Sequence, residues 1–310
     1  MTDGRTGRLS MIRVPHLVQY QGSKRSLAQR ILAFCPRSVS RLVEPFAGTA
    51  AMSVAAAMQR RSRKFWLNDL NSPLIELLKL AINHPQELAN SYADLWSQQE
   101  SDSMSHYFQV RTEFNESHDP TLFLYLLARC VKGAVRYNSE GDFNQSPDKR
   151  RRGTRPETMR KNIEGVSQLL RGHCELTAWD YREVLEGVSP RDLVYLDPPY
   201  QGVCGRGDSR YLSGIEFDDF VLALEKLNQK GIAFLVSYDG QRGEKRFGQV
   251  LPKSLGLEHI TLTAGRSSQA TLLGRDEMTI ESLYLSPSLC KQHPLDVPTA
   301  TREPRQLTLW

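Results

Sequence analysis

Short apolar runs alternate along this chain with longer stretches of helical periodicity. The apolar runs predict strands at residues 41–46, 64–68, 175–178, 193–196 and 232–237. Helical periodicity predicts helices at residues 50–58, 72–82 and 217–229, the second with Ser72 as its cap and Pro73 just inside. This alternation predicts an α/β fold of the doubly wound kind, with a mostly parallel sheet.

Between residues 85 and 171 the pattern changes to polar, aromatic-interleaved helical sequence without a convincing strand. We interpret residues 85–173 as an inserted helical subdomain, and residues 12–84 together with 174–286 as one α/β domain. Within that domain, residues 259–263 and 280–286 flank a Gly-containing connection, which predicts an antiparallel pair at the sheet edge. The Pro-rich, polar residues 287–310 are expected to form a disordered tail without a role in the fold.

The run Asp197-Pro198-Pro199-Tyr200 directly follows the predicted strand 193–196. Because Pro cannot donate to a sheet ladder, the strand must stop there, with the Asp197 carboxylate at its C-terminal end. The two prolines also favour an extended backbone without N–H donors, so that acceptors dominate. Such a segment can hold both N–H bonds of an aromatic amine, and Tyr200 offers a face on which a base can stack. Asp197, Pro198 and Tyr200 therefore indicate methylation of an exocyclic amine such as adenine N6, although a strand followed by an ordinary Pro-Pro turn is the alternative.

Acidic residues also follow two of the other predicted strands, at the end of the sheet where doubly wound proteins bind ligands. Asp69 lies 21 residues after Gly48 and is suited to accept hydrogen bonds from ribose hydroxyls. The loop that contains Phe46 and Gly48 lacks the G-x-G-x-x-G pattern, but its small residues permit close approach of a ligand. Together they indicate an adenosine group without phosphates. Asp69 could instead cap a helix, and Asp180 could either cap the helix from Tyr181 or accept from an adenine amino group.

Composition narrows the classes of protein to which this chain can belong. The chain has 310 residues, is 40% hydrophobic and carries a net charge of +5, which permits a large core and nucleic-acid binding. Its five cysteines are scattered without C-x-x-C spacing, and its seven histidines form no metal-binding or triad pattern, so we expect no metal and a reducing cytoplasm. No apolar run is long enough for a signal segment or a membrane span.

Several motifs in a fixed order carry a family resemblance. They are Tyr20-Gln-Gly-Ser-Lys24, Phe46-Ala-Gly-Thr49, Asn68-Asp69, Arg136-Tyr-Asn138 with Gly141-Asp-Phe-Asn144, and Asp197-Pro-Pro-Tyr200. With these motifs, over roughly residues 12–286, the chain resembles the Dam-type, D12-class DNA adenine-N6 methyltransferases. The chain departs from the family pattern in the first loop, which reads Phe-Ala-Gly-Thr-Ala where a second Gly is common, and at Tyr20, where Trp is more usual.

The resemblance implies an S-adenosylmethionine-dependent enzyme with a Rossmann-like catalytic domain and a helical target-recognition insert between the second and third strands. It assigns Tyr20 and Lys24 to the cofactor motif, Asp69 to the ribose, Asp197 to catalysis and Tyr200 to base stacking. The candidate cofactor contacts are then Tyr20, Lys24, Phe46, Gly48, Asp69, Asp180 and Asp197.

The implied partner is double-stranded DNA, from which the target adenine must be flipped because a stacked amine cannot reach the end of a central strand. The basic run Lys149, Arg150, Arg151 and Arg152 is suited to phosphates, although a solvated loop is the alternative. Arg136, Tyr137 and Asn138 are suited to groove contacts or to lining the pocket of the flipped base, although they could equally be polar residues at a helix end. Asn144 is a further candidate for DNA contact. The late segment 266–269 and Arg275 are weaker candidates for DNA contact.

Other functions remain open from sequence. Methylation of cytosine N4 would use the same chemistry. Ribosomal RNA methyltransferases have four-residue motifs similar to Asp197-Pro198-Pro199-Tyr200. A catalytically inactive DNA-binding module would keep the fold without the activity. For the enzyme, we expect a cytoplasmic monomer in a restriction–modification or phage setting, with a separately encoded restriction endonuclease as a candidate partner.

Overall fold

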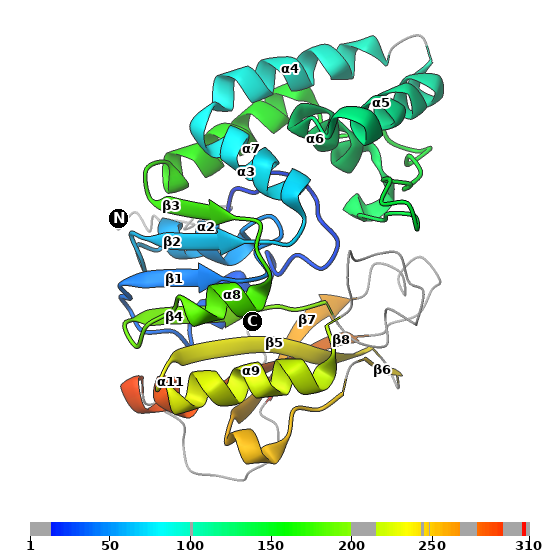
Figure 1. Cartoon of the computed structure of the whole chain (residues 1–310). Helices are drawn as coiled ribbons and strands as arrows, with labels where there is room; N and C mark the ends of the chain where they lie inside the picture. The colour runs from blue at the N-terminus through cyan, green and yellow to red at the C-terminus, as the bar shows by residue number, and fades with distance from the viewer. Residues whose placement is uncertain are drawn as a thin grey trace, which may run out of the picture.

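The computed structural model describes residues 14–99, 102–199, 215–242, 245–247, 249–266, 278–293 and 306–307. Its centre is one sheet with the strand order β3-β2-β1-β4-β5-β8-β7-β9, with β6 paired to β5 (Figure 1). The strands are β1 (Arg41–Glu44), β2 (Phe65–Asn68), β3 (Cys174–Thr177), β4 (Asp192–Leu196), β5 (Ala233–Arg242), β6 (Lys245–Phe247), β7 (Glu258–Arg266), β8 (Met278–Leu285) and β9 (Gln306–Leu307). Strands β3, β2, β1, β4 and β5 are parallel, and β8 is antiparallel to both its neighbours. The mostly parallel α/β sheet predicted from sequence is confirmed.

Helices cover both faces of the sheet. They are α1 (Ala28–Leu32), α2 (Ala51–Met58), α3 (Ser72–Asn83), α4 (Pro85–Gln98), α5 (Ser103–Ser117), α6 (Pro120–Arg129), α7 (Pro156–Leu170), α8 (Tyr181–Glu186), α9 (Phe217–Gln229) and α11 (Pro287–Gln292), with short 3-10 turns at η1 (Val131–Gly133) and η2 (Lys253–Leu255). In Figure 1, α8 and α9 lie in front of the sheet and α2 lies behind it.

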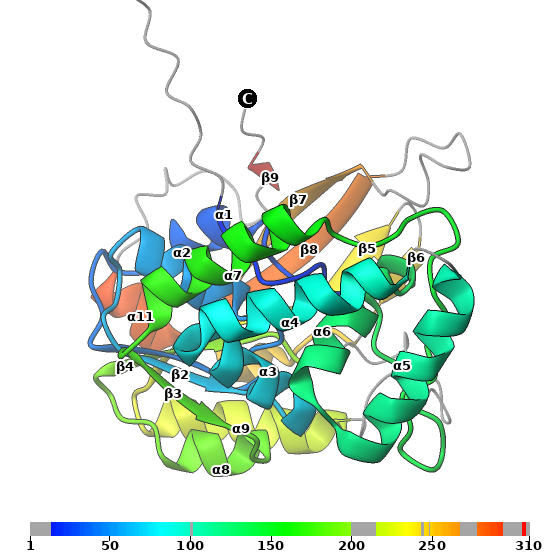
Figure 2. The same ribbon diagram turned by 90° about the horizontal axis from the view of Figure 1, so that it is seen from above.

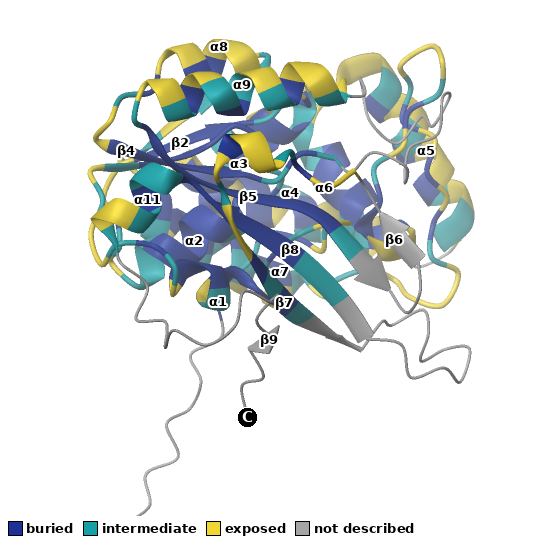
Figure 3. Ribbon diagram, turned by 90° about the horizontal axis from the view of Figure 1, so that it is seen from below, coloured by how far each residue is buried: buried dark blue, intermediate teal, exposed yellow. Residues whose placement is uncertain are grey.

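Alternate residues of the central strands face these two layers. Leu42 and Leu67 join a core with α1, α2 and α3, whereas Val43, Trp66 and Val194 join a second core with α8 and α9. All five residues of β4 are buried. Because helices cover both faces, central strands read as continuous apolar runs rather than as alternating ones. Figure 3 shows this buried centre between exposed helix surfaces.

The insert between β2 and β3 is helical, as predicted. Its helices α4, α6 and α7 pack on α3, and α7 also contacts α2, so that the insert continues the first core (Figure 2). Asp102 and Asp119 cap α5 and α6 by accepting hydrogen bonds from backbone N–H groups of the first turn. The helical insert is therefore joined to the sheet through apolar packing of α3 and α7.

Two expectations about single elements need correction. Ser72 is the first residue of α3, and the cap position belongs to Asn71. Strand β5 continues past residue 237 to Arg242 across a register shift between Ser237 and Gly240, where Asp239 has a φ of 42°. This irregularity breaks the apolar pattern, so that the sequence signal stopped early.

The expected disordered tail from residue 287 is wrong for its first residues. Ser286 caps α11 by accepting from the Leu289 N–H, and the Leu289 side chain is fully buried. Gln306 and Leu307 form β9, which pairs in parallel with β7. These segments are part of the fold because each completes a packing or pairing surface of the sheet.

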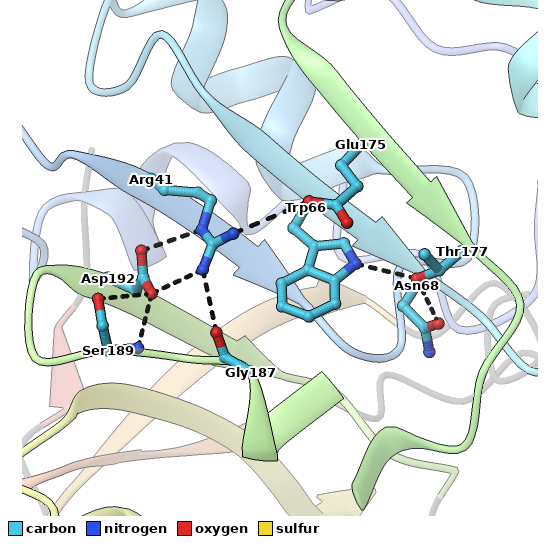
Figure 4. A network of polar contacts seen from close by, with 8 residues as sticks. All are labelled: Arg41, Trp66, Asn68, Glu175, Thr177, Gly187, Ser189 and Asp192. Carbon is cyan, nitrogen blue, oxygen red and sulfur yellow. Dashed lines mark hydrogen bonds and ion pairs between the residues drawn. The ribbon is translucent and has the colours of Figure 1, made fainter. Parts of the chain in front are cut away.

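Polar contacts link neighbouring strands both at their amino ends and at their carboxyl ends (Figure 4). Near the start of β1, Arg41 donates two hydrogen bonds to the Asp192 carboxylate, at 3.0 and 2.9 Å. At the opposite end, the buried Asn68 amide donates to the Pro45 and Trp179 carbonyl oxygens. Its oxygen accepts from the Thr177 hydroxyl and the Trp179 N–H. Asn68 therefore fixes the segments that leave β1 and β3 relative to β2.

Replacing Asn68 with Ala should lower the free energy of unfolding by about 2–4 kcal/mol, because it leaves buried carbonyl, N–H and hydroxyl groups without partners. Urea denaturation would measure the loss. Glu76→Ala, which removes an exposed ion pair with Lys79, is the control and should change stability by less than about 0.5 kcal/mol. A loss at Asn68 no larger than that of the control would contradict this role.

Candidate active site

A cavity of about 420 Å³ opens at the carboxyl ends of the parallel strands. Its walls come from the segments that follow β1, β2, β3 and β4 and from residues 20–24, which precede α1. The cavity is lined by all the described candidates for catalysis and cofactor binding, namely Tyr20, Lys24, Phe46, Gly48, Asp69, Asp180, Asp197 and Pro198. Sequence reasoning thus predicted a set of residues that the fold brings together.

Asp197 directly follows β4. Its carboxylate contacts Lys24, which lies in the segment before α1. The Lys24 ammonium donates to Asp197 Oδ1 at 2.8 Å and to the Gly22 carbonyl oxygen at 3.3 Å. A second carboxylate, Glu281 on β8, lies with Oε2 3.8 Å from the same ammonium. All three charged side chains are largely shielded from solvent, with 7% exposure for Lys24 and 17% for each acid.

Burial sets the protonation of this cluster. Burial raises the pKa of Asp197 to about 6 and Glu281 adds to the increase, while Lys24 opposes it. For Lys24, burial alone would lower the pKa, but the carboxylates of Asp197 and Glu281 raise it above its ordinary value. At neutral pH the site therefore holds an ionised Asp197 beside a protonated Lys24.

The loop after β1 is held by Asp69 at the end of β2. Asp69 Oδ2 accepts from the Gly48 N–H at 2.9 Å, and Oδ1 accepts from the Asn71 N–H at 3.0 Å. Burial raises the pKa of Asp69, although these two hydrogen bonds oppose the increase. Asp69 thus orders the loop, a contact that neither of the two roles weighed from sequence includes.

The same loop adopts left-handed backbone conformations at Gly48, with φ 51°, and at Ala50, with φ 57°. A side chain at Gly48 would meet the Tyr20 ring at 3.5 Å. Since a left-handed conformation favours Gly, Ala50 adopts a backbone conformation that its side chain makes unfavourable.

Aromatic side chains form another wall of the cavity. The rings of Phe46 and Tyr181 lie 5.2 Å apart, and Trp179 contacts Trp66 edge-on at 6.0 Å. The Tyr181 hydroxyl is buried and makes no hydrogen bond among the described residues. Tyr181 and Trp179 were not among the sequence candidates, although both flank Asp180 in the chain.

Asp180 caps α8 and lines the cavity. Its Oδ1 accepts from the Arg182 N–H at 2.9 Å, and the Arg182 guanidinium contacts both carboxylate oxygens. Hydrogen bonds from the Arg182 side chain lower the pKa of Asp180. The capping role weighed from sequence is therefore confirmed, and contact with a ligand stays a prediction.

Two further polar residues line the cavity: Glu44, which sequence reasoning missed, and Tyr137, which belongs to the Arg136-Tyr-Asn138 motif. Glu44 accepts from the Ser53 N–H at 2.7 Å, and burial raises its pKa to about 7. Tyr137 donates its hydroxyl to Asn71 Oδ1 and thereby links the insert to the segment before α3. The apolar run around Glu44 was a signal for a buried acid, whereas the contact between Tyr137 and Asn71 spans 66 positions in the chain.

The candidates for DNA contact lie on the insert, outside the cavity lining. Arg136 and Asn144 are exposed neighbours, joined by a hydrogen bond from the Asn144 N–H to the Arg136 carbonyl oxygen. Asn138 Oδ1 accepts from the N–H groups of Glu140 and Asp142 and orders its own turn. The helix-end alternative is wrong for Arg136 and Asn138, because they lie beyond η1 in an irregular loop.

The basic run also lies in a loop, between η1 and α7, where Lys149, Arg150, Arg151 and Arg152 are exposed. Tyr200, residues 267–269 and Arg275 lie outside the described residues.

Within the described part of the chain, no helix is long and apolar enough to cross a membrane. Likewise, no group of three or more His, Cys, Asp or Glu side chains among those residues is arranged to hold a metal ion.

Comparison with known proteins identifies the family. The model of D12 class N6 adenine-specific DNA methyltransferases matches residues 20–266. The chain is 27% identical to the DNA N-6-adenine-methyltransferase of Escherichia phage P1 over 236 residues, which are 72% of this chain and 30% of the phage protein. It is 29% identical over 187 residues to the DNA adenine methylase of Escherichia coli (strain K12), covering 59% of this chain and 64% of that enzyme.

A third relative covers nearly all of both chains. The DNA adenine methylase of Vibrio cholerae is 26% identical over 285 residues, which are 89% of this chain and 97% of that enzyme. In contrast, the chain spans less than a third of the phage protein and less than two thirds of the Escherichia coli enzyme. Because the family model matches from the cavity segment at Tyr20 to the end of β7, the chain belongs to the D12 class of N6 adenine-specific DNA methyltransferases.

Proposed function

We propose that this protein transfers a methyl group from S-adenosylmethionine to N6 of an adenine flipped out of duplex DNA. The observation that carries the proposal is the Asp197 carboxylate, which lines the cavity at the end of a fully buried strand and is held there by Lys24. The prolines that follow Asp197 add carbonyl acceptors without competing N–H groups. This arrangement suits an amine that must be held by both of its hydrogens.

The cavity fits the methyl donor in size and in chemistry. Its volume of about 420 Å³ lies in the usual range for small-ligand sites, about 300–1,000 Å³. Phe46 and Tyr181 offer apolar surface for an adenine ring, and the buried Tyr181 hydroxyl is available for a hydrogen bond. Asp69 and Gly48 are suited to the ribose, and Tyr20 and Lys24 to the methionine end. When bound, the donor would supply an electrophilic methyl group on a sulfonium.

The residues of this chain act by positioning and by hydrogen bonding. Asp197 accepts one N–H of the target amine through the carboxylate oxygen that Lys24 does not occupy, and the Pro198 carbonyl accepts the other. Holding the nitrogen in attack geometry can lower the barrier by about 7–11 kcal/mol. Asp197 need not be a strong base, because the amine loses its proton after the nitrogen has become cationic. Tyr200 would stack against the flipped base.

Duplex DNA would be held by the insert. Arg136 and Asn144 are exposed beside one another, and the basic run lies on the same subdomain, so that phosphates and base edges would be met from there. Flipping costs a few kcal/mol, which these contacts would offset. We expect a cytoplasmic monomer acting in a restriction–modification or phage setting, with a cognate endonuclease as its candidate partner.

Replacing Asp197 with Asn should reduce transfer of labelled methyl groups to DNA at least about 1,000-fold, because the amide presents an N–H donor where an acceptor is needed. Duplex affinity should change by less than about threefold, since Asp197 does not lie on the insert. Asp218→Asn, at an exposed position of α9, is the matched control and should keep full activity. Retained turnover in the Asp197 variant would refute the assigned role.

The rate of transfer should fall about tenfold per pH unit below pH 6, because burial raises the pKa of Asp197 to about 6 and protonation removes the acceptor. Since the folded pKa lies above the ordinary value of 3.8, ionisation of Asp197 should also lower the free energy of unfolding as pH rises from about 4 to about 6. A pH–rate profile at saturating substrate tests the first effect. An acid limb centred near pH 4 would contradict it.

Replacing Asp69 with Ala should weaken S-adenosylmethionine binding at least about tenfold, because the Gly48 N–H loses its acceptor and the ribose loses its partner. Calorimetry with the purified protein measures this directly. Asp94→Ala, an exposed change on α4, should leave binding unchanged. If the unaltered protein does not bind the donor at all, the inactive DNA-binding module becomes the better interpretation.

A further inference from the structure

Buried side chains hold the backbone of the basic loop by hydrogen bonds. The segment 145–154 contains Lys149 to Arg152, and five of its carbonyl oxygens accept hydrogen bonds from side chains of α4, α5 and α6 or the residue that follows α4. Tyr107 donates to Gln145 at 2.8 Å, Arg129 donates to Asp148 at 3.0 Å and to Arg151, Gln99 donates to Arg152 at 3.1 Å, and Tyr92 donates to Thr154.

These donors belong to the interior of the insert. Tyr92 and Tyr107 are fully buried, Gln99 is 1% exposed and Arg129 is 2% exposed. The Arg129 guanidinium also donates to the Ser103 carbonyl oxygen, and the Arg129 main chain accepts from the Asp148 N–H at 2.8 Å. A solvated surface loop would not require such support, because water can satisfy its carbonyl groups.

The loop displays its basic side chains to solvent. Lys149, Arg150, Arg151 and Arg152 are all exposed, as is Arg155 just beyond the segment. Asp148 orders the turn, since it accepts from the Arg150 N–H and pairs with Arg151. A buried guanidinium beneath a row of exposed cations is electrostatically unfavourable in the isolated protein. A polyanion along the loop would relieve that repulsion.

We propose that Tyr92, Gln99, Tyr107 and Arg129 hold residues 145–154 as a preformed surface for the phosphate backbone of the substrate duplex, with Arg129 as the central positioning residue. The inference rests on the proposed function, because it takes the bound polyanion to be the DNA that is methylated. Fixing the backbone before binding lowers the entropy that ordering a loop would otherwise cost on association. None of the four positioning residues needs to contact DNA.

The test compares loosening of the loop with removal of its charges. The double variant Tyr92→Phe/Tyr107→Phe keeps both rings and every charge. It deletes only the two hydroxyls that donate to the ends of the segment, at Thr154 and Gln145. Amide hydrogen exchange across 145–154 should become about tenfold faster, and the dissociation constant for a nonspecific duplex should rise severalfold. Arg129→Lys is the second variant, because it keeps the charge but cannot reach all of the carbonyl oxygens.

Lys149→Ala/Arg150→Ala is the matched charge variant. Its amide exchange should stay unchanged in the rest of the insert, while the slope of log affinity against log salt should become shallower by about 1.8, at about 0.9 for each lost phosphate contact. Binding of S-adenosylmethionine should be the same in all these proteins.

Three outcomes would overturn the inference. The first is unchanged exchange in both loosened variants, which would mean that the side chains do not hold the loop. The second is faster exchange with unchanged duplex affinity, which would mean that the support has no role in binding. The third is tighter binding of an RNA hairpin or of polyglutamate than of duplex DNA, which would assign the surface to another polyanion. If the proposed function itself is wrong, the unaltered protein will not transfer methyl groups to DNA. That result is separate from any of the outcomes for the variants.

Discussion

The ion pair between Lys24 and Asp197 is the contact on which the site depends. It joins residues 173 positions apart and brings the segment before α1 over the carboxyl end of β4. Without that contact, a carboxylate buried at the end of the strand would be costly to ionise, and the cavity would lose one of its walls. Glu281 on β8 contacts the same ammonium and connects the antiparallel part of the sheet to the cluster. The charged cluster around the candidate catalytic acid is therefore built from three separate parts of the chain.

A second constraint fixes the cavity relative to the insert. Asn68 ties the segments after β1 and β3 to β2, and Asp69 holds the Gly48 loop from the next position. Asn71 then accepts from Tyr137 of the insert. Three polar residues at the end of β2 and just after it thus order the Gly48 side of the cavity and the side that faces the insert.

The sequence predicted much of this arrangement because its strongest signals are local. Fully buried strands such as β4 read as apolar runs, and a Pro-Pro pair after such a run marks both the strand end and the acid before it. The helix Phe217–Gln229 agrees with its predicted bounds for the same reason. Asp197 and Asp69 could be named in advance, because parallel strands of one sheet bring their carboxyl ends to a common edge.

What escaped prediction depends on contacts between distant segments. Glu281 follows an ordinary strand pattern, and only the pairing of β8 with β5 brings it beside Lys24. The support of the basic loop by Arg129 and Tyr92 requires three helices to pack, which periodicity alone does not specify. Helix α11 was missed because its six residues resemble a polar tail until Leu289 is seen to be buried.

The central claim is that the acid at the end of β4 holds an adenine amine for methylation. Sequencing that reports modified bases, applied to DNA from a methylation-free host expressing this protein, tests the claim most directly. The account predicts N6-methyladenine at one fixed sequence context, absent when Asp197 is replaced by Asn. Modification of cytosine alone, or unmodified DNA in the presence of soluble, donor-binding protein, would contradict it.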